Sequence, residues 1–140
     1  MADVVYNSFK QKIMDGSIDL DTDTIRVALV TSSYTPDQDA HEDFADITNE
    51  VSGTGYVAEG AALASTAVTK DNTDNEGVFD ADNVTWSTAT LTARGAVVYK
   101  DSGTPATSWL VAYFDFTEDK SSSGGDFVLT WATEGIVNIG

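Results

Sequence analysis

Residues 92–139, TARGAVVYKDSGTPATSWLVAYFDFTEDKSSSGGDFVLTWATEGIVNI, decide the fold class of this chain. Three runs rich in β-branched and aromatic residues are separated by clusters of turn-forming residues at 100–103 and 121–126. This pattern is typical of consecutive antiparallel strands. In the middle run, residues 109–116, apolar side chains occupy both alternating faces, so we expect a strand that is covered on both sides.

The composition predicts one folded domain over residues 1–140. The absence of cysteine excludes disulfides, thiolate metal sites and a cysteine nucleophile. No apolar run approaches the roughly 18 residues that a membrane-spanning helix needs. Residues 1–3 have neither the basic nor the apolar region of a secretion signal. We therefore expect no membrane association.

The charge balance limits the partners that this protein can bind. Seven Lys and Arg residues stand against 23 Asp and Glu residues, which gives a formal net charge of −16. A surface this acidic repels phosphate groups, and this argues against direct binding to nucleic acid or to anionic membranes. Solubility alone accounts for such a charge, and the alternatives are shallow cation sites or a partner with a basic face.

The N-terminal segment predicts a short helix over residues 3–14. Val5, Phe9 and Ile13 recur at every fourth position, Asp3 is placed to cap the helix, and Gly16 is placed to end it. We expect residues 1–16 either to pack on the sheet or to form an arm that docks on a neighbouring subunit. Residues 17–140 are expected to form the β domain.

The remaining residues alternate between strand patterns and turn formers. Further strands are expected at residues 24–31, 61–70, 78–79 and 84–86. Loops and turns are expected at residues 32–41, 49–60 and 71–77, with one helical turn at 42–48. Seven or eight strands with one short N-terminal helix predict a mainly β protein, either an antiparallel β-sandwich or a jelly roll, with a partly open barrel as the alternative.

The carboxylates do not form a recognisable calcium motif. Asp19, Asp21 and Asp23 match the opening of an EF-hand loop, but the glycine and glutamate that the loop needs further on are absent. Solvated side chains are the simpler interpretation of the other loop carboxylates. A looser calcium site is the alternative, built from Asp71, Asp74, Glu76, Asp80 or Asp82.

Two further sequence features do not predict catalysis. Gly53-x-Gly55-x-x-Ala58 resembles a dinucleotide fingerprint, but that motif requires a strand–turn–helix unit that the sequence does not predict. His41 stands in a polar loop without a Gly-x-Ser-x-Gly motif elsewhere, so we expect an exposed, non-catalytic histidine. The sequence thus predicts a protein that is not an enzyme and that has no cofactor and no metal.

Four segments together resemble a family of small virion proteins of tailed bacteriophages. They are YNSFKQKIMDGSIDLDTDTIRVALVTSSYTPD at 6–37, NEVSGTGY at 49–56, VFDADNVTW at 78–86 and KSSSGGDFVLTW at 120–131. The resemblance covers nearly the whole chain. It implies a head decoration, or cement, protein, with a β-sandwich or jelly-roll subunit that often sits as a trimer on the capsid exterior and has no catalytic residues.

From this resemblance we expect the partners to be the major capsid protein and further copies of this chain, as a homotrimer on the outside of the virion. Exposed strand edges and an N-terminal arm are natural places for such contacts. The alternatives are a tail, neck-adaptor or fibre-associated virion protein, and a carbohydrate- or calcium-binding β module at the host surface. The candidate contact residues are Val4, Val5, Tyr6, Phe9, Tyr34 and Pro36.

Overall fold

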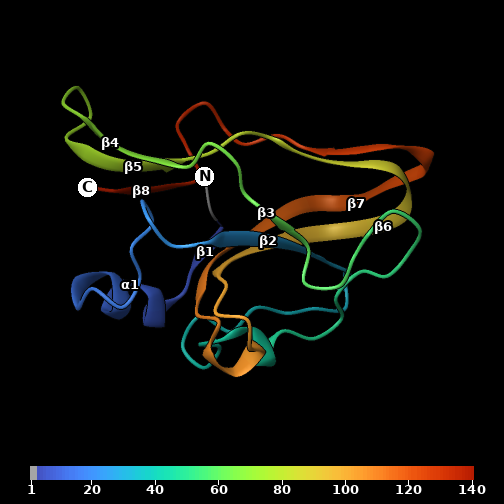
Figure 1. Ribbon diagram of the computed structural model, residues 1–140, viewed down its shortest axis with the longest axis horizontal. Coiled ribbons are helices and arrows are strands. Elements are labelled where there is room, and N and C mark those ends of the chain that lie inside the picture. Colours follow the sequence, from blue (N-terminus) through green and yellow to red (C-terminus); the bar gives the residue numbers. More distant parts are fainter. Residues whose placement is uncertain (1–2) are drawn as a thin grey trace.

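One long antiparallel ribbon organises the fold (Figure 1). The computed structural model describes residues 3–140, and in it β6 (Val84–Lys100) pairs with β7 (Leu110–Leu129) along most of its length. Both strands are rich in β-branched and aromatic residues, which favour the extended backbone. The hairpin between them is closed by a short 3₁₀ turn, η2 (Pro105–Thr107).

The ribbon belongs to the larger of two antiparallel sheets. The five-stranded sheet has the order β1 (Val4–Val5), β7, β6, β2 (Ile25–Val30) and β3 (Ala61–Ala62). The three-stranded sheet has the order β4 (Ala67–Asp71), β5 (Glu76–Asp80) and β8 (Val137–Ile139). The prediction of a mainly β single domain, with two antiparallel sheets in a sandwich-like arrangement and one helix, is confirmed.

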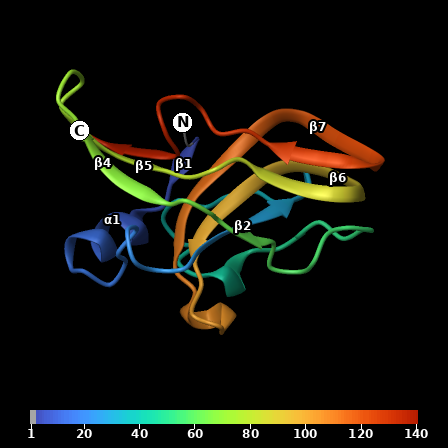
Figure 2. The same cartoon turned by 45° about the horizontal axis from the view of Figure 1, so that its top comes forward.

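The ribbon bends sharply near its middle. Ala93 pairs with Lys120 and Gly95 with Asp115, so residues 116–119 bulge out opposite a single residue of β6. A Cβ atom on Gly95 would lie 2.6 Å from the Tyr113 ring, so only glycine fits at this crossing. Figures 1 and 2 show the result: at the end away from α1 the ribbon turns back, and its outer half covers its inner half.

A core lies on each side of the inner strands. Residues 110–114 are all buried, which confirms the predicted strand covered on both faces. Between the two halves of the ribbon, Phe114 packs on Trp131 with ring centroids 5.3 Å apart. On the opposite side, Tyr99 stacks on Phe44 at 4.4 Å. Fully burying a large apolar side chain stabilises a fold by roughly 1.5–3 kcal/mol, and these four rings are all at least nine-tenths buried.

Three predictions about the strands are wrong, and the first fails because clusters of turn formers mark bulges as well as reversals. Residues 121–126 do not form a loop between strands but lie within β7, where the register shifts around Gly124. Residues 84–86 are not a short separate strand but the start of β6. The strand expected at 61–70 is divided into β3 and β4 by a bend at Ser65, whose φ is +54°.

The N-terminal helix starts later than predicted. Val4 and Val5 pair with Tyr113 and Ala112 as β1, and α1 runs over Asn7–Met14. The Asp3 carboxylate does not cap the helix but accepts a hydrogen bond from the backbone N–H of Asp115. Gly16 follows the helix with φ +81°, as predicted. Within residues 3–16, the segment is packed on the sheet rather than detached as an arm.

The helical elements are otherwise short. The helical turn expected within residues 42–48 is confirmed as η1 (Phe44–Asp46), where Asp43 and Asp46 form a reciprocal capping box. No helix within residues 3–140 has the length and apolar character to cross a bilayer.

Candidate functional site

The six candidate contact residues lie close together, but the structure buries half of them. Gln38, on the loop that follows Pro36, donates a hydrogen bond through Nε2 to the Val5 carbonyl at 2.7 Å. The exposed fractions of Tyr6, Phe9 and Tyr34 are only 0%, 1% and 4%. These three side chains stabilise the subunit itself, which corrects the expectation that all six residues face a partner. Partly exposed are Val4, Val5 and Pro36.

A chain of hydrogen bonds fixes the loop of residues 34–41. The hydroxyls of Tyr6 and Tyr34 are 2.8 Å apart, and the Tyr34 hydroxyl lies 2.9 Å from His41 Nδ1. The Asp37 backbone N–H also donates to His41 Nδ1, so this nitrogen is the acceptor and Tyr34 must donate to it. Tyr6 then donates to Tyr34. Burial raises the pKa of Tyr34 to about 12.

His41 is therefore not the exposed side chain that the sequence predicted. It is half-buried and its ring stacks on Tyr34. The polar neighbours of His41 in the sequence suggested exposure, but Tyr34, seven residues earlier, covers the ring. The arrangement holds a surface loop against the start of α1, because each hydroxyl has a defined partner.

A second tyrosine closes the outer edge of β2. The Tyr56 hydroxyl accepts a hydrogen bond from the Leu29 backbone N–H at 2.9 Å and donates to Glu50 Oε2 at 2.6 Å. The same carboxylate oxygen accepts from the Glu59 N–H at 2.6 Å. Burial raises the pKa of Glu50, while the bonds from Tyr56 and Glu59 act in the opposite direction. The phenol thus supplies the partner of one backbone N–H of β2, at Leu29, between the pairing with β3 and the bridge from Val30 to Glu50.

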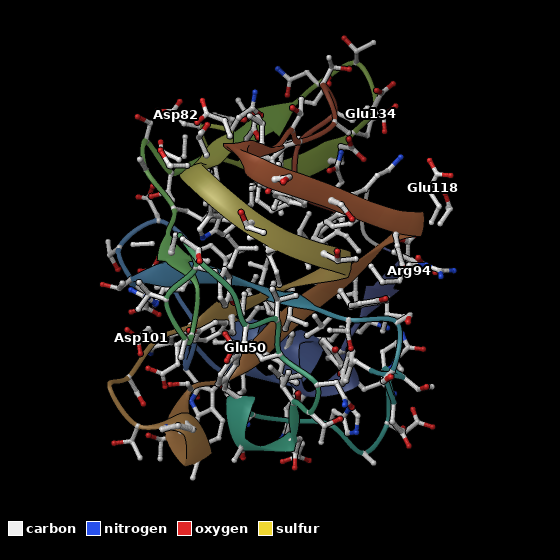
Figure 3. The ribbon with its side chains drawn as sticks, turned by 90° about the vertical axis from the view of Figure 1, so that its right-hand side faces the viewer. Glu50, Asp82, Arg94, Asp101, Glu118 and Glu134 are labelled. Atoms are coloured by element: carbon white, nitrogen blue, oxygen red, sulfur yellow. The ribbon has the colours of Figure 1, made fainter. Side chains whose placement is uncertain are left out.

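The three-stranded sheet has an acidic outer face. Asp71, Glu76 and Asp80 stand on β4 and β5, and Asp74 and Glu134 come from the adjoining turns; all five line one shallow hollow. Figure 3 shows Glu134 at the end of the molecule that carries this sheet, well away from the labelled Asp101. Below, we call these five residues the acidic face.

Three members of the acidic face lie close enough to share a cation. Carboxylate oxygens of Asp71, Asp74 and Glu76 lie within 4.8 Å of one another. Asp71 Oδ1 already accepts the backbone N–H groups of Thr73 and Asp74, so part of its capacity holds the turn. Oxygen ligands of this kind suit calcium. Of the five residues considered from the sequence, Asp80 and Asp82 stand outside this cluster.

The Asp19–Asp23 loop is satisfied by its own neighbours. Asp19 Oδ1 accepts the Asp21 backbone N–H at 3.0 Å, and Asp23 Oδ2 lies 3.1 Å from Lys100 Nζ. Hydrogen bonds, chiefly from the Thr22 side chain, lower the pKa of Asp19. These contacts fit a structural turn, in agreement with the missing EF-hand residues.

A groove next to the acidic face was not predicted from the sequence. It lies between α1 and β8, and we call it the edge groove. Val5, Phe9 and Ile13 form one wall, and Val137 and Ile139 form the other. The apolar period of α1 was visible in the sequence. Its opposite wall was not, because β8 lies more than 120 residues further along the chain.

None of the protein-family models, curated proteins or solved structures with which the chain was compared matches it.

Proposed function

We propose that this protein is a structural component of a tailed-phage virion that decorates the capsid exterior and stabilises the capsid by protein–protein contacts. The observation that carries the proposal is the resemblance of the four sequence segments, which together cover nearly the whole chain. The partners in this proposal are the major capsid protein and further copies of this chain, as a homotrimer around a local threefold axis.

The fold is compatible with this role. A decoration protein needs a stiff scaffold and surfaces for neighbours, and the doubled ribbon supplies the first. Open strand edges, which are natural sites for pairing with another chain, occur at β1, β3, β4 and β8. A net charge of −16 keeps many copies soluble before assembly and steers them toward a basic face.

The direct test is cryo-electron microscopy of particles that carry this chain, with the density assigned to it. We expect density on the capsid exterior at local threefold positions. Density confined to the tail or the neck would replace the proposal with a tail or adaptor role. Absence of the chain from purified particles, established by mass spectrometry, would overturn both roles.

A binding assay with undecorated capsids tests the contact residues. Deleting residues 1–15 would not test the interface, because it would remove the buried side chains of Tyr6 and Phe9. Val4→Asp changes a half-buried side chain that also packs on the core, and we expect the folded variant to show reduced co-sedimentation with capsids. Val57→Asp is the matched control, since Val57 is 73% exposed on a distant loop. Equal binding of both variants would exclude Val4 from the interface.

A further inference from the structure

The open edge of β8 faces the edge groove. β8 is the outermost strand of its sheet and pairs only with β5, through Phe79↔Val137, Val78↔Asn138 and Gly77↔Ile139. Its other edge has no strand partner and borders the groove, where α1 lies against the face of β8 that carries Val137 and Ile139 and where Asp3 and Lys10 are also present. Two large apolar side chains at this groove are unusually exposed, Met14 at 88% and Ile139 at 51%. An open strand edge beside an apolar wall is the arrangement that binds added strands in proteins.

The pleat of β8 separates two kinds of surface. Val137 is buried with Phe9 in the main core, and Ile139 lies on the same face of the strand, toward the groove. The Asn138 side chain points to the opposite face, where its Nδ2 donates to Glu76 Oε1. A strand that pairs with β8 must repeat this alternation. Every second side chain would enter the apolar groove, and the others would face the carboxylates.

In the part of the chain that the structure describes, the carboxylates on that second side have no oppositely charged partner. Asp74, Glu76 and Glu134 line a hollow that also includes Val5 and Val137. Within residues 3–140 none of these three carboxylates lies within ion-pair distance of a Lys, Arg or His side chain. A Lys or Arg side chain is the complementary group, and the net charge of −16 favours the approach of a basic segment.

Other sheet edges are less suited to this role. β1 and β3 have two residues each, and β4 carries the exposed charge of Lys70, a feature that discourages pairing at edges.

We propose that the edge groove binds an extended segment of another protein in which apolar residues alternate with Lys or Arg, added as a strand to β8. The apolar side chains pack between α1 and Ile139, and the basic side chains lie over Asp74, Glu76 and Glu134. This inference does not depend on the virion role, because it rests only on the geometry and charge of the groove. Since β8 has three residues, the affinity is modest, with a Kd on the order of 10–100 μM.

The probe is a seven-residue capped peptide of alternating Val and Lys, beginning and ending with Val. Two controls share its length: one replaces each Lys with Glu, and the other has the same composition in the order four Val, three Lys. Titration is followed by fluorescence anisotropy and by amide NMR. We expect saturable binding of the alternating peptide, at least fivefold weaker binding of both controls, and shifts concentrated in residues 5–14 and 134–140.

Paired variants locate the site. Ile139→Asn should weaken binding at least fivefold, whereas Val128→Asn, at a similarly exposed position on β7, should change it less than twofold. Glu134→Gln should weaken binding two- to threefold at low salt but not in about 0.5 M NaCl, where charges are screened. The Glu134 side chain is exposed, and Asn138 donates only to the Glu134 backbone carbonyl, so Glu134→Gln should preserve the fold.

Three results would overturn the proposal. One is the absence of saturable binding, and another is equal binding of the Glu peptide or of Ile139→Asn. The third is self-association of the free protein that Ile139→Asn abolishes in light scattering, since a second copy would then occupy the groove. None of these outcomes bears on whether the protein is part of a virion.

Discussion

The hydroxyl of Tyr56 is the partner of the Leu29 backbone N–H in β2, and Tyr56→Phe removes it without changing the ring. Leu29 is fully buried, and its backbone N–H has this hydroxyl as its partner. A buried N–H without a partner costs about 1–3 kcal/mol. Loss of the bond to the half-exposed Glu50 adds about 0.5–1.5 kcal/mol, because water replaces part of it. We therefore expect the variant to be destabilised by about 2–4 kcal/mol.

Urea unfolding followed by tryptophan fluorescence at pH 7 measures this change. In thermal unfolding of a domain of this size, the same loss of 2–4 kcal/mol should lower Tm by about 5–15 °C. Tyr113→Phe is the matched control: Tyr113 is also buried, but its hydroxyl makes no hydrogen bond within residues 3–140. It should cost less than about 0.5 kcal/mol. If the two variants lose equal stability, the hydroxyl of Tyr56 does not replace a strand partner.

Glu50→Gln separates the charge from the hydrogen bonds. The amide oxygen can still accept from Tyr56 and Glu59, so stability at pH 7 should stay within about 1 kcal/mol of the original protein. Because burial raises the pKa of Glu50, its protonation favours the folded state at low pH. This contribution is lost as the pH rises from about 4.3, the ordinary value, through the raised pKa. The variant should lack this part of the pH dependence.

Three further predictions test other parts of the structure. Gly60→Ala should lower the free energy of unfolding by about 3 kcal/mol or more, because the added Cβ would lie 1.8 Å from the Val27 carbonyl oxygen. Gly16→Ala is the control, with a similar φ but open space, and should cost about 1 kcal/mol. Equal melting temperatures of the two variants would contradict the close approach at Gly60. Burial raises the pKa of all five tyrosines, so absorbance at 295 nm should show little phenolate at pH 10–11 while the protein is folded. The stability that these protonated phenols provide is present below about pH 10 and lost above it, so alkaline unfolding should accompany their ionisation. Asp74→Asn should raise Tm by about 1 °C at low salt, because it relieves repulsion from Asp71 and Glu76. The variant should have no effect on Tm in about 0.5 M NaCl, where charges are screened. A lower Tm at low salt would instead show that the Asp74 carboxylate stabilises the turn.

The alternation of residues 92–116 was sufficient to predict the class of the fold. Period-two patterns with apolar residues on both faces have few interpretations other than a covered strand, and β2 and the inner half of the ribbon follow them. The bend was not predictable in the same way. It accompanies register shifts in the hairpin and the close approach of Tyr113 to Gly95, and the proximity of those two positions depends on the register of the whole hairpin.

In the candidate surfaces too, features set by neighbouring residues were predictable, and features set by distant residues were not. The turn expected at residues 71–77 is confirmed for residues 72–75, because the signal there is local in the sequence, whereas Asp71, Glu76 and Gly77 belong to the flanking strands. The burial of Tyr6 and Tyr34 was missed, since each hydroxyl finds its partner 28 residues away. Aromatic residues near the N-terminus indicated a contact, but the sequence did not specify whether that contact lies within the subunit or outside it.

The doubled ribbon has a consequence for cooperativity. Because the same two strands supply both the covering and the covered layer, neither layer can detach while the other keeps its structure. We therefore expect the slowest-exchanging amides of residues 84–93 and 95–100 to share one opening free energy in native-state hydrogen exchange, equal to that of global unfolding. A protein built in this way resists partial opening by heat or force and yields in a single step.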